Sequence, residues 1–209
     1  QFMPYPRQSD DFYHASKIND SNYIHVACKN WDIQVIEIMQ STIFGVNTKL
    51  TQEHSIGTRF DYDQYFGTIV NRFVIQAIMG MPITVYGTGY QRTGLMCLQD
   101  SVDSLAGLWE QKFDNSHQII NHVAEKRYSV QEIGEKVQVI ADNNGYHCEI
   151  SHEFDPRNEQ PTEKEQYEIL AGYTKNKKYS NFDDVLTDMF KIVEANKSKI
   201  EKEIILLNL

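Results

Sequence analysis

Residues 11–17 read DFYHASK, and the interpretation of the whole chain depends on this stretch. In a helix, Tyr13 and Lys17 lie four residues apart on one face, so the phenol and the ammonium point into the same space. Free tyrosine loses its proton near pH ~10, and a neighbouring ammonium favours the phenolate. The pair suits a proton acceptor for an alcohol that is being oxidised. The same spacing also occurs in solvated helices, so the pair alone is a weak signal.

The composition is that of an acidic globular protein. The chain has 209 residues, of which 41% are hydrophobic, and its net charge is −9. The length fits one domain or one and a half. An acidic chain argues against nucleic acid as the main partner, and no apolar run approaches the ~20 residues of a membrane span. Any anionic ligand must therefore be held by local cations.

The three cysteines, Cys28, Cys97 and Cys148, are far apart and form no C-x-x-C pair. This pattern indicates a reducing compartment and gives no metal site. The chain opens on Gln1 without a signal peptide. We therefore expect a cytoplasmic protein, or one of the plastid stroma if the source is a photosynthetic eukaryote.

Helices and strands are expected to alternate along the chain. Ser9 is a plausible N-cap for the first helix, and Ser129 with Glu132 has the spacing of a capping box. Residues 46–64 show no periodicity and are expected to form a loop. Helices are expected near residues 9–29, 66–78, 100–109, 130–140, 163–171 and 182–207, and strands or extended segments near residues 33–44, 83–86, 95–98, 118–123 and 147–154.

Several motifs, in order, resemble the extended short-chain dehydrogenase/reductases. The reactive pair is followed by a helix, a strand and IFG at residues 43–45, then by PITVYGTG at 82–89 and QDSV at 99–102. More narrowly, the chain resembles the branch of this family that forms UDP-sulfoquinovose. The motifs that carry the narrower resemblance are FYHASK at 12–17, RFDYD at 59–63, FGT at 66–68, NRF at 71–73 and YSVQE at 128–132.

The resemblance covers residues 4 to about 157 and implies an α/β fold. The implied fold is the C-terminal part of a Rossmann-type NAD-binding fold, interleaved with a small α/β substrate-binding domain. Residues 1–45 and 95–127 would belong to the NAD-binding domain, and residues 46–94 and 128–209 to the nucleotide-sugar-binding domain.

A full family member opens with a glycine-rich turn that holds the NAD pyrophosphate on a helix N-terminus. Gly87 and Gly89 do not match this fingerprint, because Arg92 stands where the third glycine would be and no helix is expected to follow. We therefore expect the C-terminal part of a longer chain, or a truncated relative.

The resemblance also implies an enzyme that uses NAD as cofactor, with UDP-glucose and sulfite as substrates. The sugar is oxidised at C4, the keto group acidifies the C5 proton, water leaves from C6, and sulfite adds to the alkene. Hydride return then yields UDP-sulfoquinovose. Tyr13 would be the acid and base for the C4 hydroxyl, and Lys17 would support the phenolate and hold the nicotinamide ribose. A homodimer is expected.

Further site residues follow from the resemblance. His14 would face the sugar as a third catalytic residue, Gln40 would lie near the nicotinamide, and Arg157 near the nucleotide diphosphate. Each also has a plainer interpretation, as a packed or surface histidine, a loop-facing amide and a surface arginine. Thr68 and Asn71 are also expected to bind the substrate, together with Arg72 and Arg92.

Arg72 and Arg92 are the other expected substrate ligands. Arg72 either binds phosphate or pairs with Asp61 or Asp63. The family reads Gln-x-Arg after the glycine turn, whereas here the arginine at position 92 comes one residue early. In an extended segment its side chain faces the opposite side, so either a bulge restores the contact or the hold on the diphosphate is weaker.

Two other functions remain open from the sequence. One is a different nucleotide-sugar epimerase or dehydratase on the same scaffold, against which the motifs at residues 59–73 argue. The other is a non-catalytic binding module that keeps the fold without the cofactor half, for which the missing glycine-rich turn argues.

Overall fold

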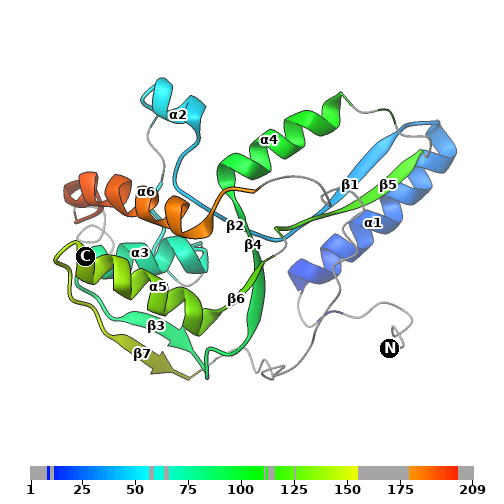
Figure 1. Cartoon of the computed structure of the whole chain (residues 1–209). Helices are drawn as coiled ribbons and strands as arrows, with labels where there is room; N and C mark the ends of the chain where they lie inside the picture. The colour runs from blue at the N-terminus through cyan, green and yellow to red at the C-terminus, as the bar shows by residue number, and fades with distance from the viewer. Residues whose placement is uncertain are drawn as a thin grey trace.

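The computed structural model describes residues 9, 12–56, 59–63, 66–110, 112, 116–124, 126–154 and 179–201. Its helices and strands alternate, which confirms the predicted α/β class (Figure 1). In chain order they are α1 (Phe12–Trp31), β1 (Val35–Gln40), β2 (Thr42–Phe44), α2 (Lys49–Glu53), α3 (Ile69–Ile78), β3 (Ile83–Tyr86), β4 (Arg92–Cys97), α4 (Leu98–Trp109), β5 (His117–His122), β6 (Arg127–Ser129), α5 (Val130–Asn143), β7 (Ile150–Glu153) and α6 (Phe182–Ala195).

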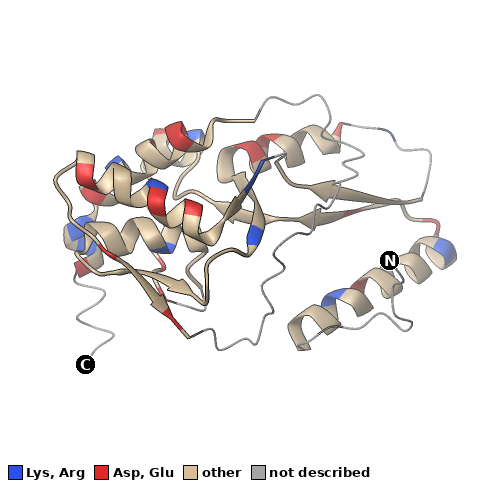
Figure 2. Ribbon diagram, turned by 60° about the horizontal axis from the view of Figure 1, so that its bottom comes forward, with Lys and Arg blue, Asp and Glu red and all other residues tan. Residues whose placement is uncertain are grey.

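A parallel pair of strands, β1 and β5, lies between two helices. Figures 1 and 2 show α1 on one side of this pair and α4 on the other. Because side chains alternate along a strand, Glu37 of β1 faces α1, whereas Gln40 faces α4. The contacts agree, since Glu37 bonds Ser21 of α1 and Gln40 bonds Ser101 of α4. This is a helix, sheet, helix arrangement of the doubly wound kind.

The hydrophobic core lies in the other part of the molecule. There the parallel pair of β3 and β7 is covered by α3 and α5, with α6 packed against both helices (Figure 1). Phe73, Ile133 and Leu186, one from each of these helices, are fully buried. The ring of Phe182, the first residue of α6, lies 4.4 Å from that of Tyr128.

Strand β4 joins the two parts by changing partners along its length. Residues 95–97 pair in parallel with β2, and residues 92–94 pair antiparallel with β6. In Figure 1 this strand crosses the middle of the molecule. A single strand therefore connects the part that contains β2 to the part that contains β6.

Some boundaries differ from those predicted. The expected single strand at residues 33–44 is interrupted at Ser41, whose amide makes the last bond to β5, at the carbonyl of His122, before β2 pairs with β4 instead. Its first part is half-buried, not fully buried. The expected loop at 46–64 contains α2, begun by a capping box of Thr48 and Thr51. Short β6 was not predicted, because it depends on pairing with β4.

The helix boundaries also shift. Helix α3 begins at Ile69, and Phe66 is 68% exposed before it. Helix α4 begins at Leu98, so Asp100 is not its cap and instead accepts hydrogen bonds from the amide and hydroxyl of Ser180. Helix α6 ends at Ala195, earlier than predicted, and residues 197–201 resume helical structure after a turn. The short helix expected at 163–171 lies outside the described residues.

Within the part of the chain that the structure describes, no helix has the length and apolar character needed to cross a membrane. All three cysteines are described, and each is a free thiol.

Two glycines give a matched test of the packing around α5. Gly134→Ala adds a methyl that would lie 3.5 Å from Ile150 and 3.6 Å from Ile83, which is ordinary contact, so it should stabilise the fold by roughly 0.5–1 kcal/mol. Gly89 has φ +73°, and a methyl there would lie 2.8 Å from Val85. Gly89→Ala should therefore destabilise by more than about 1 kcal/mol. Urea denaturation measures both, and equal signs would contradict this packing.

Candidate functional site

Three predicted catalytic residues gather in the first turns of α1. The ammonium nitrogen of Lys17 lies 5.6 Å from the ring centroid of Tyr13, and the ring of His14 meets that of Tyr13 edge-on at 5.3 Å. Tyr13 is 66% exposed, and the side chain of Lys17 is 58% exposed and reaches Asp20 at 3.5 Å. The i and i+4 positions thus share one face, open to a ligand.

Gln40 lies at the carboxyl end of β1. Its amide nitrogen donates to the hydroxyl of Ser101 at 2.9 Å and lies 3.5 Å from Nδ1 of the fully buried His122. Because α1 runs back along the strand that follows it, its first turn and the end of β1 lie at the same edge of the sheet. Tyr13, Lys17 and Gln40 therefore lie toward the carboxyl edge, where open α/β sheets bind ligands, with the Gln40 side chain on the α4 face of the strands.

Thr68 and Asn71 lie at the start of α3 and have different surroundings. The amide of Asn71 donates to the carbonyl of Gly45 at 3.0 Å and accepts from its N–H at 2.9 Å, so it fixes the turn after β2. Gly45 has φ +122°. Thr68 is the N-cap residue, and its buried hydroxyl has no hydrogen-bond partner among the described residues. Asn71 is thus committed to the backbone, whereas the Thr68 hydroxyl is buried without a hydrogen bond to any described residue.

Arg72 is buried, with 7% exposure. Its guanidinium donates to the carbonyl of Thr84 at 3.1 Å and lies over the ring of Tyr86 at 5.1 Å. Asp61, one of the two partners expected for it, pairs with Arg59. These contacts give Arg72 a clear role in tying α3 to β3.

Arg92 is extended at the first residue of β4 and holds Glu132 with both ends of its guanidinium, at 2.9 and 3.3 Å. Glu132 also accepts from the amide of Ser129 at 2.6 Å, as the second half of the capping box of α5. The Ser129 amide, followed by the charge of Arg92, lowers the pKa of Glu132 below its ordinary value of 4.5. The guanidinium remains about half exposed. Arg157 lies outside the described residues.

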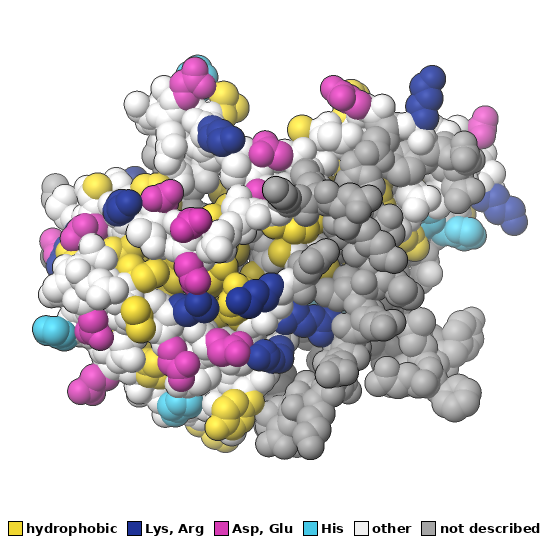
Figure 3. All heavy atoms as spheres, viewed as in Figure 1, with side chains coloured by type: hydrophobic (Ala, Val, Ile, Leu, Met, Phe, Trp, Pro, Cys, Tyr) yellow, Lys and Arg dark blue, Asp and Glu magenta, His cyan; other side chains and the backbone are white. Residues whose placement is uncertain are grey.

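Cations gather around Arg92 although the chain is acidic overall. Figure 3 shows Lys and Arg side chains close together near the middle of one face, over β4, β6 and the start of α5. Lys126 directly precedes β6, Arg127 is its first residue, and Lys136 comes from α5, where it pairs with Asp183 at 2.7 Å. This is the kind of local cation group that an anionic ligand of this chain requires.

A polar cluster between α1 and the sheet was not predicted from the sequence. Ser21 of α1 and His117 of β5 both bond the carboxylate of Glu37 on β1. A charged residue inside the otherwise apolar run VIEIM was the available signal. Among the described residues, no three His, Cys, Asp or Glu side chains gather in a way that would hold a metal ion.

Two curated relatives match the chain. UDP-sulfoquinovose synthase from spinach (Spinacia oleracea), described as chloroplastic, is 36% identical over 176 residues, which are 83% of this chain and 35% of the relative. UDP-sulfoquinovose synthase from Sulfolobus acidocaldarius is 36% identical over 153 residues, 73% of this chain and 39% of the relative. The chain thus spans less than half the length of either. No family model matches it.

Solved structures share the fold. UDP-glucuronic acid 4-epimerase from Bacillus cereus, in complex with UDP-glucuronic acid and NAD, superposes with a TM-score of 0.68 at 16% identity, over 93% of this chain and 57% of that one. The likeness confirms the Rossmann-type fold.

The pH dependence of stability tests the contacts of Glu132. Its folded pKa is lowered, so its contribution is fully present above pH 4.5 and is lost as the pH falls through the folded pKa. Glu132→Gln keeps the capping bond but removes a partly exposed charge, so it should cost roughly 0.2–1 kcal/mol at pH 7, and less below pH ~4. Urea denaturation from pH 7 to 3 measures the difference, with Glu135→Gln on the same helix as control. A cost that grows as the pH falls would contradict the assignment.

Proposed function

Because the chain is a homologue of the C-terminal part of the UDP-sulfoquinovose synthases, we propose that it forms part of an NAD-dependent enzyme that converts UDP-glucose and sulfite to UDP-sulfoquinovose. The observation that carries the proposal is the gathering of Tyr13, His14 and Lys17 at the start of α1. This group lies toward the carboxyl edge of the sheet, at which β1 ends with Gln40.

The residues at this edge fit the nicotinamide end of NAD. They offer a phenol and an ammonium on one helix face, with a fixed amide at the adjoining strand end. NAD bound there would supply an acceptor for hydride from the sugar and would later return it. The chain's own part is proton transfer: Tyr13 takes the C4 hydroxyl proton, and the ammonium of Lys17 stabilises the phenolate electrostatically.

Lys17 would also hold the ribose of the cofactor, since its flexible stem leaves the ammonium free to reach past the Tyr13 ring. His14 would face the sugar from the same turn. Gln40 would present its amide to the nicotinamide, oriented by the bond that it donates to Ser101.

The cations around Arg92 are proposed to hold the diphosphate of the nucleotide sugar. A guanidinium that grips a carboxylate with two hydrogen bonds has the geometry to grip a phosphate in the same way. Binding would exchange Glu132 for the phosphate oxygens. Thr68 would bind substrate directly, whereas Asn71 and Arg72 would support the site by fixing backbone. Arg157 would be a further ligand of the diphosphate.

Several finer points belong to the same proposal. Sulfite as the sulfur donor and the division into an NAD-binding and a sugar-binding domain are proposed from the resemblance of the sequence motifs. A homodimer is supported by the outer face of α1, where Tyr23, Val26 and Trp31 are more than half exposed. The free thiols of all three cysteines support a reducing compartment, the cytoplasm or a plastid stroma.

Replacement of the reactive pair tests the proposal. Tyr13→Phe keeps the ring but removes the proton acceptor, so sulfite-dependent formation of UDP-sulfoquinovose should fall by ~10²–10⁴, with UDP-glucose binding little altered. Lys17→Ala should impair turnover and NAD affinity together. In the double variant the two losses should not add, because both destroy one proton-transfer unit. Full activity in Tyr13→Phe, measured by product chromatography, would refute the role of Tyr13.

A further inference from the structure

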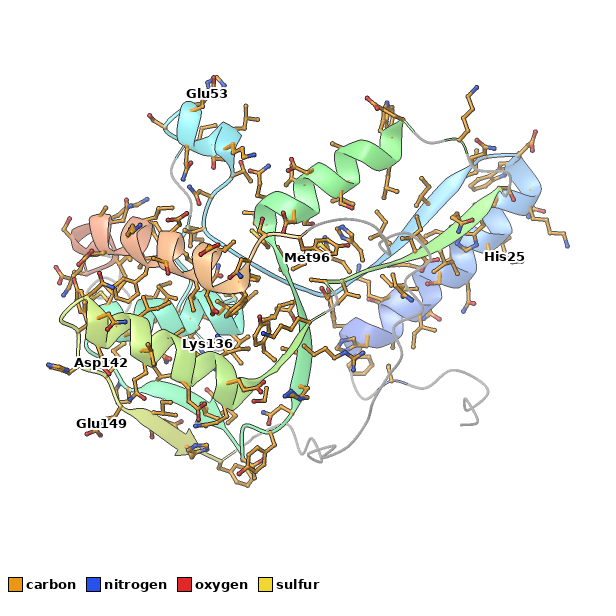
Figure 4. The ribbon with its side chains drawn as sticks, viewed as in Figure 1. His25, Glu53, Met96, Lys136, Asp142 and Glu149 are labelled. Atoms are coloured by element: carbon orange, nitrogen blue, oxygen red, sulfur yellow. The ribbon has the colours of Figure 1, made fainter. Side chains whose placement is uncertain are left out.

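A carboxylate is buried where α1 meets the sheet. The side chain of Glu37, in the middle of β1, is 12% exposed, and His117 beside it on β5 is 13% exposed. The carboxylate accepts a short hydrogen bond from the hydroxyl of Ser21 and lies 2.9 Å from Nε2 of His117. His25, labelled in Figure 4, lies one turn further along α1 with its ring 6.0 Å from that of His117.

This cluster by itself contributes little to the free energy of unfolding. Desolvating a carboxylate is costly, and an apolar side chain of similar size would fill a helix–sheet contact at less cost. The best-attested use of such a buried polar group is to select one register of packing. Here the hydrogen bonds come from three elements, α1, β1 and β5, and they form together only if the helix sits at one position along the strands.

The half-buried stripe of α1 shows what a shift would do. Positions 15, 18, 21, 24 and 27 are partly covered, and Ser21 is the polar member between Ile18 and Ile24. A slip by three residues in either direction would place an isoleucine against the carboxylate of Glu37. That arrangement removes a hydrogen bond from a buried charge, so it is strongly disfavoured.

The same helix carries the reactive pair. Ser21 lies one turn after Lys17 and two turns after Tyr13, and its hydroxyl also lies 3.3 Å from the carbonyl of Lys17. A slip of one turn would carry Tyr13 by ~5.4 Å along the sheet. Gln40 is only three residues beyond Glu37 on β1. The register of α1 therefore sets where the phenol lies relative to that strand end.

We propose that Glu37 is a positioning residue. Held between Ser21 and His117, it fixes the register of α1 on β1 and β5, and it thereby places Tyr13 and Lys17 at the carboxyl edge. The link to turnover rests on the proposed function, whereas the register of the helix does not.

The accessibility of Cys28 reports the docking of α1 directly. Cys28 lies on this helix and is 5% exposed, whereas Cys148 is 9% exposed between α5 and β7 and serves as an internal reference. In the native protein, Glu37→Ala should raise the alkylation rate of Cys28 by about tenfold or more and leave Cys148 unchanged. Mass spectrometry of the alkylated peptides measures both rates.

Milder and matched variants keep the test decisive if Glu37→Ala folds poorly. Ser21→Ala should raise Cys28 alkylation by a smaller factor. Ser16→Ala removes an exposed hydroxyl that bonds the Tyr13 carbonyl of its own helix, and it should leave Cys28 protected. Glu37→Gln should restore most of the protection, since its amide can accept from Ser21 and donate to His117.

Kinetics separate positioning from simple support of the fold. Glu37→Ala should lower kcat with the KM for UDP-glucose little changed, and Glu37→Gln should recover most of kcat. Unchanged Cys28 alkylation in both Glu37→Ala and Ser21→Ala, or a raised KM with unchanged kcat, would overturn the proposal. Failure of the proposed function appears separately, as full activity in Tyr13→Phe, and leaves the alkylation result intact.

Discussion

The parallel pairing of β1 with β5 is the interaction on which the rest of the structure depends. Its six-residue register, from Val35 opposite His117 to Gln40 opposite His122, decides which side chains face each helix. One face brings Glu37 and His117 together under α1. The other places Gln40 and His122 beneath α4. Because the strands are parallel, their carboxyl ends meet at one edge, and the proposed site residues of α1 and β1 lie toward that edge.

A second constraint ties this edge to the cation group. Strand β4 pairs with β2 at residues 95–97 and with β6 at residues 92–94. Arg92 therefore lies on a strand that also pairs with β2, the strand that follows β1. The capping box of α5 then gives Arg92 a carboxylate to hold, at 2.9 Å. An acidic chain thus keeps a guanidinium oriented and half exposed, as the proposed exchange of Glu132 for a phosphate requires.

The sequence predicted what short-range patterns determine. The spacing of Tyr13 and Lys17, the Ser129 capping box and the α/β alternation all involve neighbours within a few residues, and the structure contains each of them. It did not predict β6, the pairing of Arg92 with Glu132, or the contact of His117 with Glu37. The partners in those two pairs are 40 and 80 residues apart. No local propensity encodes such contacts, because the register of the sheet creates them.

Together these features support one proposal, that the chain supplies the acid–base residue and the diphosphate-binding arginine of a sulfoquinovose-forming enzyme. Mass spectrometry of the nucleotide sugars made from UDP-glucose, with and without isotopically labelled sulfite, tests it most directly. We predict that the product carries the labelled sulfur and that its amount depends on sulfite. A C4 epimer of UDP-glucose, formed equally with and without sulfite, would contradict the claim.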